Sequence, residues 1–143
     1  MESKDLKKVS PRSPREIIGG YAILARAIDK CRASIAFTNG EYHFNCPVDR
    51  MFFEFKGIDA EAFKQKVAEG ATDADLLAFV NENGTPKTVE EIKAWSESVI
   101  KSDYHNDPEK KEWFDGECAR LGLDPEKNYL FDYLDADDIQ SYT

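Results

Sequence analysis

Apolar side chains recur at helical spacing in the first quarter of the chain. The positions that form this apolar face are Ile17, Tyr21, Leu24, Ile28, Cys31 and Ile35. Steps of three and four residues indicate one face of an amphipathic helix. The segment 13–16 supplies a capping serine, a proline suited to the first helical position and a glutamate that reaches back to the cap amide. We therefore predict a long helix from Ser13, with Arg26, Asp29 and Lys30 outside its apolar face.

Two glycines interrupt this pattern. Gly19 and Gly20 each cost roughly 1 kcal/mol relative to alanine in a helix interior. Close packing of another backbone would offset that cost, and so would a bend or a later start of the helix.

The segment 39–56 has a different pattern. Asn39-Gly40 is a turn signal, and residues 41–49 show no helical period. From Pro47 to Lys56 the apolar positions fit a short buried helix with Cys46 as its N-cap. A hairpin is the alternative, because aromatic residues alternate on both sides of the Cys-Pro-Val-Asp turn.

Four further helices have recognisable start and stop signals. We expect them from Asp59 to Glu69, from Asp73 to about Asn81, after the capping box of Thr88 and Glu91, and from Asp107-Pro108 to Gly122. Residues 130–134 are apolar enough to dock on these helices, and an acidic tail follows them.

These elements predict an all-α fold. The chain has 143 residues, of which 41% are hydrophobic, so it is long enough for one domain with a real core. We expect a single-domain orthogonal helical bundle of about six helices, with a possible small hairpin within residues 36–56. Residues 1–12 are predicted to be a mobile basic arm, and residues 13–143 the helical domain with an acidic C-terminal tail.

Charge is unevenly distributed along the chain. The net charge is −9, but residues 1–34 carry +4 and residues 35–143 carry −13. The basic N-terminal segment is therefore expected either to dock on the acidic remainder or to remain a solvated tail. An acidic surface repels phosphate backbones, so we predict no nucleic-acid partner.

The apolar segments are short. The longest, residues 17–25, has nine residues, whereas a spanning helix needs about 20. The first twelve residues lack the apolar region of a secretory signal. Three cysteines cannot all pair within one chain, and reduced thiols are the default without export. We therefore predict a cytoplasmic protein with no membrane partner.

The three cysteines differ in their surroundings. Cys31 and Cys118 lie on apolar helical faces, which is typical of buried core thiols. Cys46 stands before a proline at a predicted helix N-terminus, where backbone amides stabilise a thiolate. His43 would act as its base, and Asp49 would either orient the imidazole or oppose the thiolate. The candidate catalytic residues are therefore Cys46, His43 and Asp49, and the simpler alternative is that Cys46 only caps a helix.

Metal binding is a further hypothesis. The residues available for it are His43, Cys46, His105 and Cys118, with Cys31 in reserve. Structural zinc usually takes a close Cys-x₂₋₄-Cys pair, which this sequence lacks. No glycine-rich phosphate-binding motif occurs either. We therefore assign no metal ligands and no cofactor.

Several short motifs follow one another through the chain. They are Ser10-Pro-Arg-Ser-Pro-Arg15, Gly19-Gly-Tyr21, Ile28-Asp-Lys-Cys-Arg-Ala33, Asn39-Gly-Glu-Tyr-His43, Cys46-Pro-Val-Asp49, Phe55-Lys-Gly-Ile-Asp59, Trp95-Ser96 and Phe131-Asp-Tyr-Leu-Asp-Ala-Asp-Asp138. This ordered set resembles the bacterial domain of unknown function 5069 (DUF5069) family, nearly end to end. The resemblance implies a small bacterial cytoplasmic protein and supplies no catalytic role. The chain departs from the family pattern at Val48, where leucine is usual, and at Cys31, where alanine is common.

The sequence leaves three kinds of function open. We favour a helical binding or interaction module for a small molecule or a protein. The candidate ligand-binding residues are Tyr21, Glu41, Tyr42 and Asn45. The alternatives are a thiol-dependent enzyme or redox sensor that uses Cys46 with His43, and a Cys/His metal-binding protein.

Overall fold

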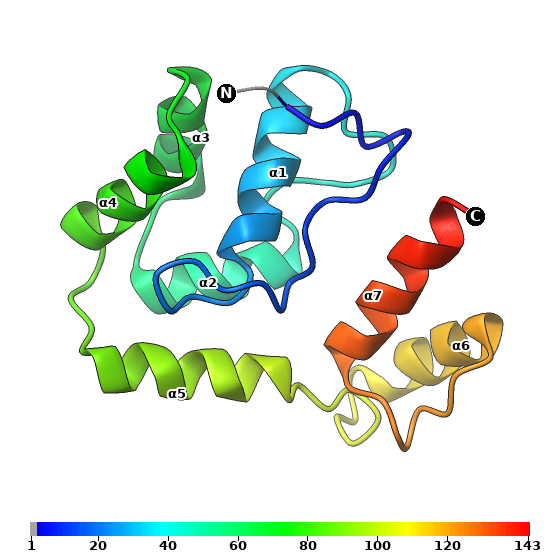
Figure 1. Cartoon of the computed structure of the whole chain (residues 1–143). Coiled ribbons are helices and arrows are strands. Elements are labelled where there is room, and N and C mark those ends of the chain that lie inside the picture. Colours follow the sequence, from blue (N-terminus) through cyan, green and yellow to red (C-terminus); the bar gives the residue numbers. More distant parts are fainter. Residues whose placement is uncertain (1–2) are drawn as a thin grey trace.

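The computed structural model describes residues 3–143, and in this range the chain folds into seven helices without a strand (Figure 1). The helices are α1 (Leu24–Ile35), α2 (Pro47–Lys56), α3 (Ala60–Ala68), α4 (Asp73–Asn83), α5 (Val89–Ile100), α6 (Lys111–Leu121) and α7 (Leu130–Ser141). The only β-type pairing in residues 3–143 is an isolated bridge between Ile18 and Tyr21. The predicted all-α class is confirmed.

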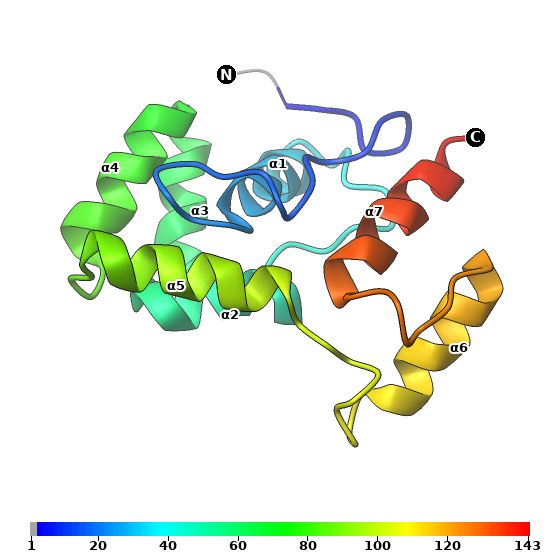
Figure 2. The same cartoon turned by 60° about the horizontal axis from the view of Figure 1, so that its bottom comes forward.

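Helix α1 lies at the centre of the molecule. It contacts α2 and α3, α3 contacts α4, and α6 contacts α7. Figures 1 and 2 show the N-terminal segment between α1 and α7 in both views. This segment therefore lies between parts of α1 and α7, and it shares with α1 the contacts that hold α7 in place.

The core surrounds α1 with aromatic and aliphatic side chains. Its largest fully buried members include Tyr21, Ile23, Leu24, Ile28, Phe52, Phe63, Leu76, Phe114, Leu130 and Phe131. Cys31 and Cys118 are also fully buried within it, as expected. Burial of the apolar face of each helix is the main stabilising contribution here, at roughly 25 cal/mol per Å² of apolar surface.

The first helix begins at Leu24, so the predicted start at Ser13 is wrong. Gly19 and Gly20 have φ angles of 58° and 91°, outside the helical region, and Ile23 has a φ of 72°. Residues 13–23 instead form turns, and the Ile23 amide donates to the Pro14 carbonyl at 2.9 Å. A later start was one of the three ways to offset the cost of the glycine pair, and it is the one the structure shows.

A buried serine of α5 holds these turns in place. The Ser96 hydroxyl accepts a hydrogen bond from the Ala22 amide at 3.0 Å and donates to the Gly20 carbonyl at 2.6 Å. It therefore satisfies two backbone groups of a segment that has no helical hydrogen bonds of its own.

The region 47–56 is the helix α2, which confirms the predicted helix and excludes the hairpin. Asp59, Thr72 and Thr88 cap α3, α4 and α5 through their side chains, also as predicted. Helix α6 begins at Lys111, after one turn in which the Asp107 carbonyl accepts the amides of Lys110 and Lys111, so the predicted start at Asp107-Pro108 is three residues too early.

The C-terminal segment forms α7, a helix that the sequence pattern did not predict. Its residues Asp132, Asp135 and Asp138 form ion pairs with arginines of the N-terminal segment and of α1. Arg26, Asp29 and Lys30 are correspondingly buried, although the periodicity placed them outside the apolar face. They lie outside the apolar face, as expected, and are nevertheless buried because the N-terminal segment, residues 39–46 and α7 together cover the polar side of α1.

The described part of the N-terminal segment lies against the rest of the molecule. The Leu6 side chain is 2% exposed, its amide donates to the Thr38 carbonyl at 2.8 Å, and its carbonyl accepts the Tyr142 hydroxyl. The basic N-terminal segment thus docks on the acidic remainder, which was one of the two alternatives. Mobility of residues 1–12 stays a prediction, and residues 1–2 lie outside the described range.

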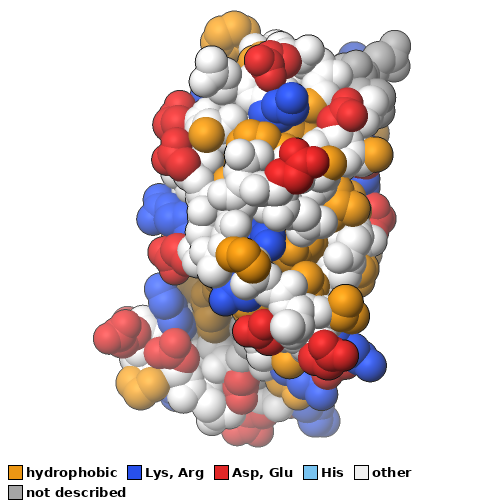
Figure 3. All heavy atoms as spheres, turned by 90° about the vertical axis from the view of Figure 1, so that its left-hand side faces the viewer, with side chains coloured by type: hydrophobic (Ala, Val, Ile, Leu, Met, Phe, Trp, Pro, Cys, Tyr) orange, Lys and Arg blue, Asp and Glu red, His pale blue; other side chains and the backbone are white. Residues whose placement is uncertain are grey.

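The surface has no single-sign region on the side that carries α3 and α4. Acidic and basic side chains are interspersed there with small apolar areas (Figure 3). No helix within residues 3–143 is long and apolar enough to cross a bilayer.

Candidate ligand-binding cleft beside Cys46

Four segments that are distant in sequence line a cleft of about 630 Å³. The lining residues are Leu6 and Lys7, Arg26 and Lys30 of α1, Gly40 to His43 with Cys46 and Val48, and Leu134, Asp137, Ser141 and Tyr142 of α7. One wall therefore belongs to α7 and the opposite wall to the 40–48 segment, with α1 beneath them. We call this the Cys46 cleft.

Cys46 faces the cleft at the N-terminus of α2. Its sulfur is 3.0 Å from the Lys30 Nζ, which donates a hydrogen bond to it. The same ammonium lies 3.2 Å from Asp49 Oδ1 and 3.1 Å from Oδ2. Lys30 is 3% exposed and Asp49 fully buried, whereas Cys46 is half-buried. Cys46 is thus the most exposed member of this trio.

The local sequence fixes this arrangement. Pro47 occupies the first position of α2, where its missing amide costs no helical hydrogen bond. Asn45 has a φ of 62°, and this turn aims its amide at Asp49 Oδ2 at 2.9 Å. Asp49 thus anchors both the turn and Lys30, and the thiol projects from a constrained helix start.

A second buried ion pair lies at the floor of the cleft. Arg26 makes a bidentate contact to Asp138 of α7 at 2.7 and 3.2 Å. The Tyr42 hydroxyl donates to the same carboxylate at 2.8 Å, and the Arg26 guanidinium lies 5.5 Å from the centre of the Tyr42 ring. Burial raises the pKa of the Tyr42 hydroxyl, and its hydrogen bond to Asp138 raises it further, so Tyr42 is a neutral donor at neutral pH.

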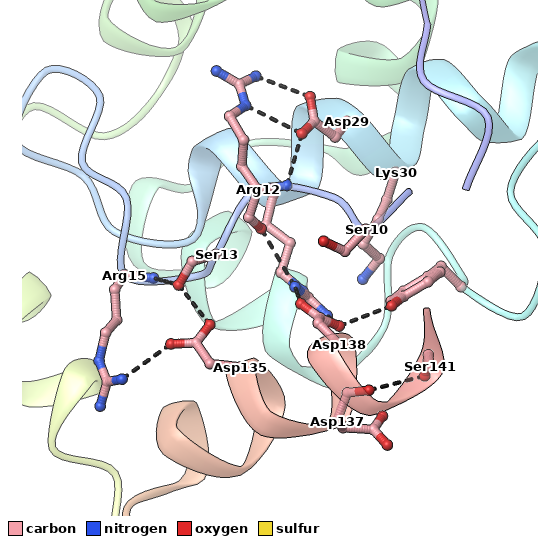
Figure 4. A network of polar contacts seen from close by, with 12 residues as sticks. Ser10, Arg12, Ser13, Arg15, Asp29, Lys30, Asp135, Asp137, Asp138 and Ser141 are labelled. Atoms are coloured by element: carbon pink, nitrogen blue, oxygen red, sulfur yellow. Dashed lines mark hydrogen bonds and ion pairs between the residues drawn. The ribbon is translucent and has the colours of Figure 1, made fainter. Parts of the chain in front are cut away.

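The N-terminal segment holds α7 through a row of polar contacts (Figure 4). Ser13 donates to Asp135 at 2.7 Å, and Arg15 pairs with Asp135 at 3.0 Å and with Asp132. Arg12 turns the other way, toward Asp29, which it contacts through its backbone amide at 2.8 Å and its guanidinium at 3.1 Å. These contacts set the distance between α1 and α7, and thereby the width of the cleft.

The structure brings four of the seven candidate residues to the cleft surface: Cys46, His43, Glu41 and Tyr42. Asp49 lies beneath, bound to Lys30, so it neither orients His43 nor lines the cleft. His43 is exposed at the rim, and no hydrogen bond within residues 3–143 joins it to Cys46. The cation beside the sulfur is therefore Lys30, and the imidazole is not in position to act as its base.

Two candidate residues lie elsewhere. Tyr21 is fully buried, packs edge-on against Phe52 and donates its hydroxyl to Asn81 at 2.7 Å, so its role is structural. Asn45 acts through its backbone: its amide donates a hydrogen bond to Asp49, and its carbonyl accepts one from the Arg50 side chain.

The remaining cysteines and histidines do not gather at the cleft. Burial raises the pKa of the Cys31 thiol to about 12 and also raises that of Cys118. His105 binds Asp115 at 2.8 Å, on α6. Across residues 3–143, no three His, Cys, Asp or Glu side chains are grouped as metal ligands.

Pattern analysis missed the cleft residues contributed by α1 and α7. Lys30 and Arg26 line the cleft and Asp138 pairs with Arg26. All three are charged residues of helices, and such residues are usually solvated. A signal was present in the complementary spacing of acidic residues 132, 135 and 138 against a basic N-terminal segment. That spacing indicates a charged helical face but does not specify which cation each carboxylate meets.

Two comparisons with known proteins bear on the chain. A family model described as a domain of unknown function (DUF5069) matches residues 8–140, which include the whole cleft except Leu6, Lys7, Ser141 and Tyr142. No curated protein matches the chain.

Proposed function

The chain belongs to the DUF5069 family of domains of unknown function, and from that premise we propose that it is a binding module whose Cys46 cleft takes a small molecule. One observation carries the proposal: four separate segments converge on a single concavity with buried polar groups at its floor. Its volume of about 630 Å³ lies within the roughly 300–1,000 Å³ typical of ligand sites.

The lining favours a ligand with an apolar body and a neutral or zwitterionic polar group. Leu6, Val48 and Leu134 supply apolar contact. The cations of the floor, Arg26 and Lys30, already face carboxylates, so the floor is close to electrically neutral. A strongly charged ligand would therefore gain little there and would lose its hydration.

We place this binding module in the cytoplasm. Its three cysteines are free, which suits a reducing compartment. The absence of a close Cys pair in the sequence supports the same placement.

The test is a fragment screen read by ¹H–¹⁵N NMR on the full chain. We expect uncharged and zwitterionic fragments with an aromatic or aliphatic body to shift the amide signals of residues 40–48 and 134–142 together. Ser141→Trp, which fills the mouth of the cleft, should abolish these shifts. Ser98→Trp is the matched control, because both serines are exposed on helices and donate to a backbone carbonyl.

Hits that shift another surface, or that bind the Ser141→Trp protein equally well, would refute the proposed binding function. Hits confined to strongly anionic fragments would refute the proposed ligand class.

Thiol chemistry at Cys46 is a second candidate function. The observation that favours it is the Lys30 ammonium 3.0 Å from the sulfur of a half-buried cysteine in a cleft. Cations beside a thiol and helix N-termini are the surroundings of reactive cysteines. Lys30, not His43, is then the residue that supports the sulfur.

Alkylation of Cys46 by iodoacetamide tests this assignment. His43→Ala should leave the rate unchanged. Lys30→Met combined with Asp49→Asn, which removes both buried charges together, should lower the rate roughly ten-fold. A rate that falls with the His43 substitution and not with the double one would reverse the two roles.

A further inference from the structure

We propose that the Lys30–Cys46 pair is a site of covalent modification, in which peroxide converts the hydrogen-bonded side chains into a reversible sulfur–nitrogen cross-link. The inference rests on the second candidate function, in which Cys46 is reactive. It adds a partner for the oxidised sulfur, and that partner lies within the same chain.

The geometry places a nucleophile directly beside the sulfur. Lys30 Nζ and Cys46 Sγ are 3.0 Å apart, which is hydrogen-bond distance. The Lys30 side chain is 4% exposed and is held from the other side by Asp49, so its nitrogen stays near the sulfur instead of moving through solvent. Such fixed proximity favours an intramolecular reaction over attack by a dissolved thiol or amine.

Access to the pair is one-sided. Cys46 and Lys30 both line the cleft, and Cys46 is the half-buried member of the pair, so a small oxidant reaches the sulfur from the cleft. The other two thiols are fully buried. Cys46 is therefore the one thiol of the three that peroxide can reach, and its sulfur is hydrogen-bonded to the Lys30 amine.

The first step balances with hydrogen peroxide as the oxidant. The Cys46 thiolate attacks a peroxide oxygen, a sulfur–oxygen bond forms and the oxygen–oxygen bond breaks. The leaving hydroxide takes a proton from the Lys30 ammonium and departs as water. Sulfur is oxidised by two electrons, peroxide is reduced, and the products are a sulfenic acid and a neutral lysine amine.

The second step uses the amine that the first step creates. The Lys30 lone pair attacks the sulfur of the sulfenic acid, a sulfur–nitrogen bond forms and the sulfur–oxygen bond breaks. The departing hydroxide takes a proton from the nitrogen and leaves as a second water. The flexible lysine stem allows the short approach, and the remaining N–H can still donate to Asp49.

The product ties α1 to the start of α2 and removes the positive charge of Lys30. Two thiol equivalents reverse it: the first attacks the sulfur, forms a mixed disulfide and releases the amine, and the second attacks the mixed disulfide and releases the Cys46 thiol with a small-molecule disulfide as by-product. The modification also shields Cys46 from further oxidation to the irreversible sulfinic acid.

The experiment treats the full chain with hydrogen peroxide and analyses it by intact mass and peptide mapping. We expect a species lighter by two hydrogen atoms, a linked peptide joining Lys30 to Cys46 and loss of tryptic cleavage after Lys30. Dithiothreitol should restore the original mass.

Two variants isolate the role of the amine. Lys30→Arg keeps a cation opposite Asp49 but removes the nucleophilic amine, so the cross-link should vanish and Cys46 should gain oxygen atoms instead. Cys46→Ser should show neither change. Circular dichroism of both variants checks that they retain the helical fold.

The outcomes distinguish failure of the cross-link from failure of the reactive-thiol function on which it rests. If wild-type Cys46 gains oxygen with no linked peptide, the cross-link is refuted while the reactive thiol stands. If Cys46 remains unmodified while a free cysteine in the same solution is oxidised, both are refuted.

Discussion

Arg26 and Asp138 form a buried ion pair between α1 and α7. Arg26 is 4% exposed and its partner Asp138 is 6% exposed, so each carries a buried charge whose direct ion-pair partner is the other. Such pairs contribute little net stability when intact, because desolvation offsets the attraction. Removing one partner is costly, since the other charge stays buried.

We therefore expect Arg26→Ala to lower the free energy of unfolding by about 3–5 kcal/mol. Arg26→Met with Asp138→Leu should recover most of that loss, because no buried charge remains. Urea unfolding followed by circular dichroism measures both variants. Equal destabilisation by the single and double substitutions would show that the charges are not coupled.

A second residue-scale contact predicts a dependence on pH. The hydrogen bond from Arg12 to Asp73, with Arg32 nearby, holds the pKa of Asp73 below its usual value. A carboxylate whose pKa is lower in the folded state stabilises the fold above its unfolded pKa of about 3.9. This stability is lost as the pH falls through the lower, folded pKa.

The wild-type protein should therefore exceed Asp73→Asn in stability at neutral pH, and the difference should shrink as the pH falls below about 4. Urea midpoints measured in steps from pH 7 to pH 2 give this difference directly. A gap between the two proteins that stays constant over this range would contradict the assigned pairing.

At the scale of elements, the first helix shows how a backbone constraint overrides periodicity. Apolar spacing alone continues back to Ile17, but Gly19 has a φ of 58°, and a Cβ there would lie 2.4 Å from a methyl group of Leu77. The turns of residues 13–23 therefore need a residue without a side chain at this position.

We expect Gly19→Ala to destabilise the protein by about 1–2 kcal/mol, the cost of the left-handed conformation for a residue with a Cβ. Gly116→Ala is the matched control, since Gly116 lies inside α6 with open space around it. That substitution should stabilise by about 0.5–1 kcal/mol. Thermal unfolding distinguishes the two, and stabilisation by both would place Gly19 in a helix.

Most of the helices that could be predicted from the sequence are marked by signals within a few residues of their ends. The caps at Asp59, Thr72 and Thr88 act within four residues, so the short-range pattern contains them. Helix α7 was missed because its aspartates favour solvent unless cations meet them, and those cations, Arg15 and Arg26, lie more than 100 residues away in sequence.

The candidate site also combines residues that are close in sequence with residues that only the fold brings together. Cys46, His43, Glu41 and Tyr42 are close in sequence and share the cleft, so a local motif sufficed to bring them together. The partner of Cys46 is Lys30, which lies on another helix. Whether the His43 imidazole or the Lys30 ammonium lies beside the sulfur depends on how α1 packs against α2, and the local sequence does not contain that information.

For the whole molecule, the cleft exists because α7 is held at a distance from α1. The N-terminal segment lies between them, and its serine and arginine contacts to α7 keep the pair α6–α7 from closing onto the central helix (Figures 1 and 4). Cys46 lines the space that this arrangement leaves open.

Native-state alkylation, resolved by cysteine, is the most direct measurement of this arrangement. Iodoacetamide should label Cys46 first, with Cys31 and Cys118 labelled only on unfolding. Ser141→Trp should slow the labelling of Cys46 several-fold, and Ser98→Trp should leave it unchanged. Prompt labelling of Cys31 or Cys118 in the folded protein, or an unaltered Cys46 rate in Ser141→Trp, would contradict the cleft.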